Sequence, residues 1–256
     1  MHRVNTTMTV YACFSKKTAV RYSPKQRKQQ SEKAQMRAET GTKSARGPMV
    51  APLKPAPLLM ERTRAWALLI EYTQGQSLIN HALAVEAAMR AYARRLGSDE
   101  ERWGATGLLH DFDYERWPDP VDHPQKGSEI LRSAGCDEEI IYAILSHAQY
   151  LELERNSPMD RALFAVDELC GLITAVALVR PSRSVRGVKL SSIKKKWKQR
   201  TFAEGVSRED IVEGASALGV ELDEHIQFVL EALQEAAGEI GLAGDLFHED
   251  AETAAA

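Results

Sequence analysis

The feature of this sequence that most constrains its fold is helical periodicity, which continues with few interruptions from Glu61 onward. Apolar residues recur at spacings of three and four, as Trp66, Leu69 and Ile70 do in the first such segment. No stretch of useful length alternates between apolar and polar residues, as a half-buried strand would. The sequence therefore predicts an all-α protein, with one compact helical bundle over residues 60–242.

Capping and stop residues predict where the helices begin and end. Ser77 and Ser207 are typical N-caps, Pro124 suits a first helical position, and Gly97 and Gly135 are typical stops. The predicted helices are 61–74, 77–96, 98–111, 123–135, one from 137 that includes His147, then 158–179, 191–202, 207–218 and 222–238.

The first 60 residues differ from the rest of the chain in charge. They contain twelve Lys and Arg residues against two acidic residues, whereas the remainder contains 21 basic and 34 acidic residues. Residues 1–59 are predicted to be a disordered basic extension, because they are polar and end in a proline-spaced stretch. A mis-assigned start, with Met60 as the true initiator, is the second interpretation, and we favour both over a transit peptide. Residues 243–256 are predicted to be a frayed tail.

Composition also argues against several classes of protein. The acidic body would repel a phosphate backbone, so we expect no nucleic acid to bind through the folded domain. No apolar stretch reaches the ~18 residues that a membrane span needs. Three scattered cysteines, of which Cys170 is expected in the core, fit a reducing cytoplasm. The oligomeric state is left open.

Six side chains that can bind metal stand beside or within the apolar segments: His81, His110, Asp111, His123, His147 and Asp167. Imidazole and carboxylate donors suit Mn, Fe, Ni, Co, Zn or Mg, and the absence of thiolates argues against a closed structural zinc site. Asp111 follows a helix end, where a carboxylate opposes the macrodipole unless a cation is near. Asp167 lies in an apolar helix and needs a partner. Taken singly, each has an ordinary interpretation as a core or capping residue.

The order of these residues resembles that of the HD-domain superfamily of metal-dependent phosphohydrolases, in particular the stand-alone bacterial members. The similarity lies in four segments: residues 78–86, 107–115, 123–127 and 165–169. Phe112 and Asp113 depart from the Ile-Gly that follows the eponymous pair. No Gly-Tyr-Pro element is present, which argues against the cyclic-dinucleotide phosphodiesterase branch.

The resemblance implies an HD-type bundle that holds one or two divalent ions. His81, His110, Asp111 and Asp167 would hold the first ion, and Asp111 would bridge to a second ion at His123 and His147. Activated water would then attack the phosphorus of a small phosphate ester, such as a nucleotide or related metabolite, by phosphomonoesterase or phosphodiesterase action. Two alternatives are a catalytically silent metal- or nucleotide-binding module and a di-iron oxygenase of the same fold.

Further residues are assigned around this centre. Asp113 and Glu115 would act with Asp111 in catalysis or would orient a ligand, unless they are ordinary loop acids. In the basic stretch 183–200, Arg186 and Lys195 would bind substrate phosphate, unless they form a solvated face.

The remaining aromatic residues and histidines receive structural interpretations. Trp103 and Trp117 are expected to pack in the core and against a loop, respectively. His225 and His248 are expected to face solvent.

Overall fold

The computed structural model describes residues 60–244, and every regular element in that range is helical. The elements are α3 (Arg62–Tyr72), α4 (Gln76–Leu96), α5 (Glu100–Leu109), α6 (Gln125–Ser133), α7 (Glu138–His147), the 3₁₀ helix η1 (Gln149–Leu151), α8 (Pro158–Leu178), α9 (Leu190–Trp197), α10 (Arg208–Leu218) and α11 (Leu222–Glu235). All described residues belong to one compact unit. The prediction of an all-α fold is confirmed.

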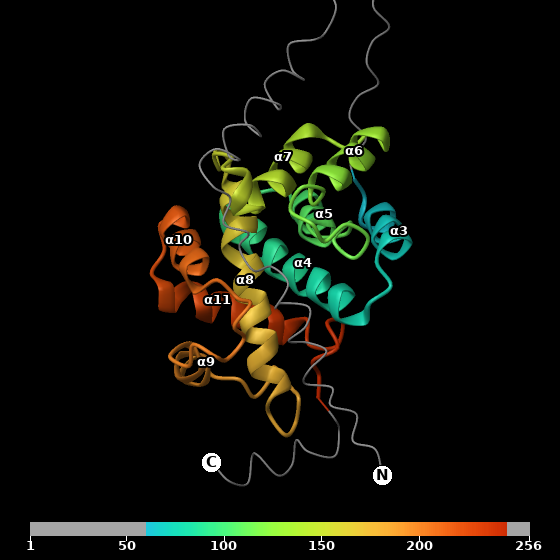
Figure 1. Ribbon diagram of the computed structural model, residues 1–256. Coiled ribbons are helices and arrows are strands. Elements are labelled where there is room, and N and C mark those ends of the chain that lie inside the picture. The colour runs from blue at the N-terminus through green and yellow to red at the C-terminus, as the bar shows by residue number, and fades with distance from the viewer. Residues whose placement is uncertain (1–59, 245–256) are drawn as a thin grey trace, which may run out of the picture. The chain divides into compact units, whose positions relative to one another are not determined.

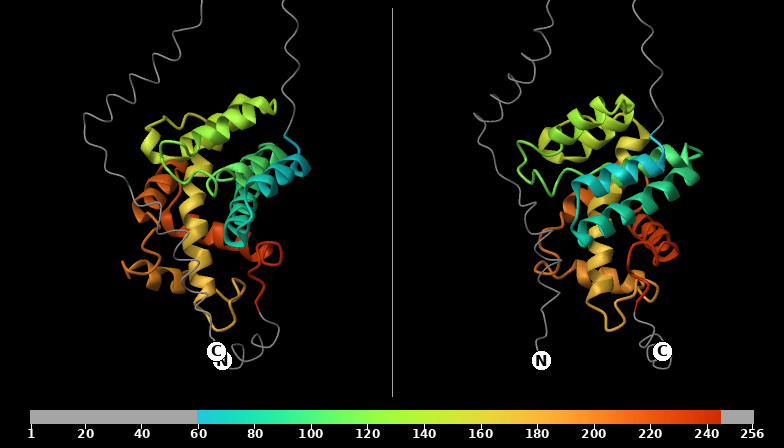
Figure 2. Two further views of the ribbon diagram at one scale, coloured as in Figure 1. Left: turned by 45° about the vertical axis from the view of Figure 1, so that its right-hand side comes forward. Right: turned by 90° about the vertical axis from the view of Figure 1, so that its right-hand side faces the viewer.

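Helix α8 runs through the middle of the bundle and is buried along most of its length (Figure 1). It packs against α4, α7, α10 and α11, and the two views of Figure 2 show these helices arranged around it. A capping box between Ser157 and Asp160 fixes its first turn. Because the central helix is enclosed on several sides, Asp167 in its middle is held in the interior.

Helices α4 and α5 approach each other closely at Gly107. A Cβ atom on this residue would lie 2.9 Å from the carbonyl oxygen of Val85 and 3.0 Å from the backbone nitrogen of Glu86. Only glycine fits at that distance, so the two backbones come nearly into contact. The approach brings His81 of α4 and His110 after α5 together, with their ring centroids 5.1 Å apart.

The predicted helix ends are correct where a local cap decides them and wrong where a distant residue does. Gly97 ends α4 with a φ of 65°, and the side chain of Ser207 caps α10. Helix α4, however, begins at Gln76 and is not capped by Ser77. The carboxylate of Glu115 accepts hydrogen bonds from the backbone nitrogens of Gln74 and Gly75 at 2.6 and 3.0 Å. An acid from another segment thus meets the positive end of α4, and the sequence around Ser77 does not reveal it.

Helices α6 and α9 are also shorter than predicted. Pro124 is the N-cap of α6 and not its first residue, so that helix begins at Gln125, two residues after the predicted start at 123. Helix α9 ends at Trp197 and does not reach Phe202, because residues after 198 turn to pack Phe202 and Val206 into the core.

The prediction that His225 faces solvent is wrong. Its side chain is 0% exposed, its Nδ1 accepts the hydroxyl of Tyr92 at 2.6 Å, and its Nε2 donates to the carbonyl of Ala165 at 2.9 Å. His225 precedes Ile226 and lies four residues before Val229, both buried, on the face of α11 that packs inward. A buried imidazole is stable there because both nitrogens have partners.

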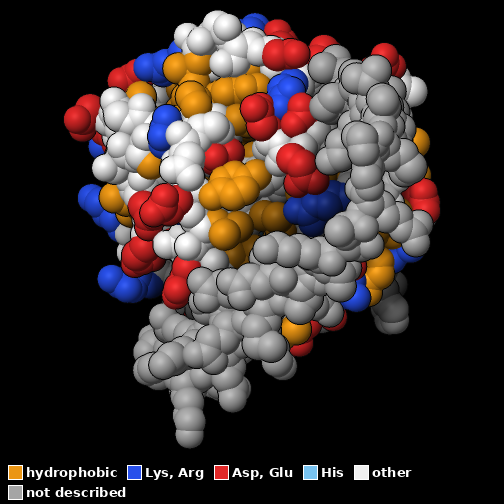
Figure 3. All heavy atoms as spheres, turned by 90° about the horizontal axis from the view of Figure 1, so that it is seen from above, with side chains coloured by type: hydrophobic (Ala, Val, Ile, Leu, Met, Phe, Trp, Pro, Cys, Tyr) orange, Lys and Arg blue, Asp and Glu red, His pale blue; other side chains and the backbone are white. Residues whose placement is uncertain are grey.

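The other sequence assignments fall partly outside the described range. Trp103 is buried, as predicted, and the ring of Trp117 lies 6.1 Å from that of Tyr72. His248, residues 1–59 and residues 245–256 are not described. Within residues 60–244, no helix has the length and apolar character that crossing a membrane requires. On the face seen in Figure 3, hydrophobic side chains gather near the middle and charged side chains surround them.

Candidate metal centre

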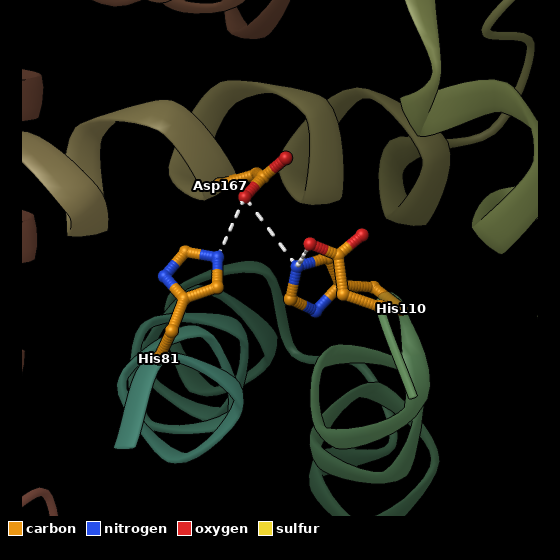
Figure 4. A group of neighbouring side chains, drawn as sticks. His81, His110 and Asp167 are labelled. Carbon is orange, nitrogen blue, oxygen red and sulfur yellow. Dashed lines mark hydrogen bonds and ion pairs between the residues drawn. The ribbon is translucent and has the colours of Figure 1, made fainter. Parts of the chain in front are cut away.

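The first group of converging side chains joins α4, the end of α5, and α8. Nε2 of His81 lies 2.9 Å from Oδ1 of Asp167, and Nε2 of His110 lies 3.4 Å from the same oxygen. Figure 4 shows Asp167 pointing from α8 toward both imidazoles. His110 Nε2 is also 3.5 Å from Oδ2 of Asp111. Four ligand atoms from three segments of the chain therefore face a common point.

The second group shares Asp111 with the first. The other carboxylate oxygen of Asp111, Oδ1, lies 3.1 Å from Nε2 of His123 and 3.3 Å from Nε2 of His147. The two carboxylate oxygens of Asp111 thus face different histidines, Oδ2 toward His110 and Oδ1 toward the other pair. This is the arrangement that a carboxylate bridging two ions requires, and it places all six predicted metal ligands in two adjoining groups.

The separations between these atoms match the spacing of ligands around one metal ion. With metal–ligand bonds of about 2.1 Å, neighbouring ligand atoms lie about 3.0 Å apart in an octahedral site and about 3.4 Å apart in a tetrahedral one. The contacts above range from 2.9 to 3.5 Å. The donor set, imidazole nitrogen with carboxylate oxygen, suits a divalent transition ion or Mg²⁺.

Hydrogen bonds to backbone carbonyls on the far side of two histidine rings decide which nitrogen can bind a metal. His110 Nδ1 donates to the carbonyl of Gly107 at 2.8 Å, and His147 Nδ1 donates to the carbonyl of Ile144. A carbonyl only accepts, so each Nδ1 carries a proton and each Nε2 of the neutral ring presents a lone pair. In His110 that Nε2 is buried and faces two carboxylates, with an oxygen of Asp167 at 3.4 Å and one of Asp111 at 3.5 Å. A lone pair opposite anionic oxygens is repulsive unless a cation lies between them.

The pKa shifts of one histidine in each group also indicate a site for a cation. Burial alone would lower the pKa of His110, but the carboxylates of Asp111 and Asp167 outweigh it and raise the pKa to about 10. Burial also opposes protonation of His123, yet Asp111 and Asp113 raise its pKa. Both shifts show that the centre attracts positive charge, which a proton or a metal ion can supply.

A thiol lies near this group but does not take part in it. Cys170 is buried on α8, and its Sγ lies 3.6 Å from the carbonyl oxygen of Ala84. Burial, followed by the charge of Asp167, raises the pKa of this thiol well above its usual value. It therefore stays protonated.

Asp113 lies behind His123 and does not point toward the shared oxygens. Its Oδ1 accepts from Nδ1 of His123 at 2.8 Å, and its Oδ2 accepts from the backbone nitrogen of Gly127 at 2.8 Å. A Cβ atom on Gly127 would lie 2.8 Å from the Asp113 carboxyl carbon, so glycine is required for this contact. Of the two roles predicted for Asp113, the geometry supports the orientation of a ligand.

The other three predicted site residues lie elsewhere. Glu115 is exposed and bonds to the backbone before α4, as described above. Arg186 contacts the carbonyl of Ala243 at 3.4 Å, and Lys195 is exposed on α9. Helix α9 packs against α11 and α8, beside the C-terminal half of α8 (Figure 1). The structure brings none of the three into the two ligand groups.

Two residues that the sequence did not predict as functional contact the backbone of the histidine ligands or of their neighbours. The hydroxyl of Tyr150 donates to the carbonyl of His123 at 2.6 Å, and Nε of Arg155 donates to the carbonyl of Ser146 at 3.1 Å. Both bonds join a side chain to a backbone atom in another part of the chain. No spacing or motif in the sequence signals such a contact.

The part of the chain that contains the two ligand groups is similar to a known type of domain. Residues 78–172 match the family model described as HD domain, and this range contains all six converging residues. Ribonuclease Y 2 of Levilactobacillus brevis is 31% identical over 101 residues, and Ribonuclease Y of Pseudothermotoga lettingae is 33% identical over 99 residues. These alignments cover 38% and 37% of this chain but only 18% of each relative. No solved structure matches the chain significantly.

Proposed function

We propose, because residues 78–172 are an HD domain, that this protein is a metal-dependent phosphohydrolase acting on a small phosphate ester, such as a nucleotide or related metabolite. HD domains bind divalent metal ions, and most act on phosphate esters. We propose which residues bind the metal, how many ions they bind and which class of substrate the protein hydrolyses.

One observation carries the proposal: the two oxygens of Asp111 face two separate sets of histidine Nε2 atoms. We assign His81, His110, Asp111 and Asp167 to a first divalent ion, and Asp111, His123 and His147 to a second. Such ions lower the pKa of a bound water toward neutrality and neutralise charge on phosphoryl oxygens.

The protein's own residues prepare the centre for this chemistry. The carbonyls of Gly107 and Ile144 hold the rings of His110 and His147 in the tautomer that leaves Nε2 unprotonated. Asp113 does the same for His123 and adds negative charge that increases the basicity of the ring. His110 is fully buried, and the other five ligand residues are each only 4–7% exposed, so the centre is shielded from bulk water.

A second candidate is hydrolysis of phosphodiester bonds in RNA, which the similarity to two proteins named ribonuclease Y favours. The acidic composition of residues 61–256 argues against a long polyanion bound by general charge attraction. The relatives are matched over less than a fifth of their length, so their activity does not transfer as a whole. A small ester needs only the metal centre and few further contacts.

The test is to count bound metals by elemental analysis in protein purified without chelators, then to measure turnover with Mn²⁺, Co²⁺, Ni²⁺ or Mg²⁺. The substrates are a panel of nucleoside mono-, di- and triphosphates, a generic aryl phosphate and an oligoribonucleotide. Asp111→Ala should abolish both metal binding and turnover. Asp119→Ala, in the exposed part of the same loop, should keep both.

The outcomes separate the alternatives. Turnover only of the oligoribonucleotide would favour the second candidate, and bound metal without turnover on any substrate would indicate a silent binding module. Iron-dependent oxygen uptake would indicate an oxygenase. Retention of metal and activity in Asp111→Ala would refute the site assignment.

We place the proposed activity in the cytoplasm. The two cysteines within the described residues, Cys136 and Cys170, are buried and unpaired, which suits a reducing compartment.

A further inference from the structure

The histidines assigned to the second ion, His123 and His147, come from segments separated by helices α6 and α7. His123 precedes α6, and His147 is the last residue of α7. Helix ends fray more easily than helix interiors, so the ring positions depend on what holds the two ends. The chain between α7 and α8, residues 148–157, supplies side chains to both ends.

Tyr150 ties this connecting segment to the backbone of His123. It lies in η1, three residues after His147, and its hydroxyl donates to the carbonyl of His123 at 2.6 Å. Although the residue is 40% exposed, the hydroxyl end is fixed by that bond. The side chain of Tyr150 thus links the backbone of His123 to the segment that follows His147.

Arg155 fixes the end of α7 from the same segment. Its Nε donates to the carbonyl of Ser146, the residue before His147, at 3.1 Å, and its guanidinium lies 3.3 Å from the centroid of the Phe164 ring on α8. The group also bonds to Gln149 and pairs with Glu213 of α10 at 3.2 Å. A cation that binds the last carbonyls of a helix is favoured by the helix dipole and replaces a missing hydrogen bond there.

The backbone of the connecting segment is itself constrained between these two anchors. Glu152 has a φ of 53°, a left-handed conformation that is unfavourable for a residue with a side chain. The surrounding contacts must maintain such a turn. Glu152 lies between Tyr150 and Arg155 along the chain, so the hydrogen bonds of these two side chains hold the segment on either side of it.

We propose that Tyr150 and Arg155 are positioning residues for the second metal ion: together they hold His123 and His147 at the distance at which both face Oδ1 of Asp111. The inference rests on the proposed two-ion function. The first group has its own supports in α4, α5 and α8, so loss of these anchors should affect the two ions differently.

The test is titration of metal-free protein with Mn²⁺, followed by calorimetry and by electron paramagnetic resonance. Tyr150→Phe keeps the ring and removes only the hydroxyl. It should weaken the second binding event roughly 10- to 100-fold, the usual effect of losing a group that orients a metal ligand, and leave the first unchanged. At limiting metal, the spin-coupled signal of a manganese pair should give way to a single-ion signal. Arg155→Lys, which keeps the charge but not the planar fork, should act in the same direction.

Tyr142→Phe is the matched control. It deletes a hydroxyl–carbonyl bond of 2.7 Å, from Tyr142 to Glu154, that does not reach either histidine. The control should keep both binding events and the coupled signal, and the unfolding midpoints of all variants should stay near that of the wild type.

Two results would overturn the inference alone: a Tyr150→Phe variant that binds both ions as the control does, or one that loses both affinities together with its folding stability. A wild-type chain that binds no ion would instead overturn the proposed function. A wild-type chain that binds a single ion would overturn the assignment of a second site, and this inference with it.

Discussion

Asp113→Asn tests whether a carboxylate behind His123 controls its ability to bind metal. The buried carboxylate accepts from two donors, Nδ1–H of His123 and N–H of Gly127, each at 2.8 Å. An asparagine has the same shape but only one accepting oxygen, and its amide group donates. One of the two donors therefore loses its acceptor, or His123 takes the tautomer with its proton on Nε2.

The size of the effect follows from these two outcomes. A buried donor without a partner lowers the free energy of unfolding by about 1–3 kcal/mol. If the imidazole changes tautomer, Nε2 no longer offers a lone pair toward Asp111, and the affinity for the second ion should fall roughly 10- to 100-fold. That loss equals about 1.4–2.8 kcal/mol of binding free energy.

Calorimetric titration of metal-free protein with Mn²⁺ measures the two affinities, and urea unfolding of the same preparation measures stability. Asp119→Asn is the control, since Asp119 accepts from the backbone nitrogen of Val121 at 2.9 Å in the exposed part of the same loop. The control should change neither quantity. Wild-type affinity for both ions in Asp113→Asn, together with wild-type stability, would show that the carboxylate neither orients His123 nor satisfies Gly127.

Three further predictions concern other parts of the structure. Gly107→Ala should lower the unfolding midpoint and weaken the first ion, because its Cβ would lie 2.9 Å from the Val85 carbonyl and force α4 and α5 apart; a variant with normal unfolding and metal content would contradict this. Burial lowers the pKa of His225 below its usual 6.5, so its contribution to stability is complete above pH 6.5 and declines as the pH falls below that value. The unfolding free energies of wild type and His225→Gln should therefore converge as the pH falls, and a constant difference between the two curves across this range would refute the prediction. His147→Ala should remove the second ion and most turnover but leave the first ion bound, and elemental analysis that finds both ions would disprove the assignment.

The sequence by itself determined the helical class and the identity of the converging side chains. Helical class follows from local periodicity, which depends only on neighbours three and four residues away. Local caps such as Ser207 and Gly97 also act within one turn, so the sequence predicted them directly. The six candidate ligands could be named because polar groups beside apolar helical segments are costly without partners, and because their order resembles a known family.

The tertiary structure alone decided which side chain contacts which. Glu115 meets the start of α4 from another segment, and His225 bonds to Tyr92 and Ala165 across three helices. Arg186 and Lys195 have the charge expected of phosphate ligands, but their elements pack away from the two ligand groups. Such contacts join residues tens of positions apart, and the packing of whole helices fixes them. The sequence shows which contacts each side chain could make, whereas the packing of the helices decides which of those contacts form.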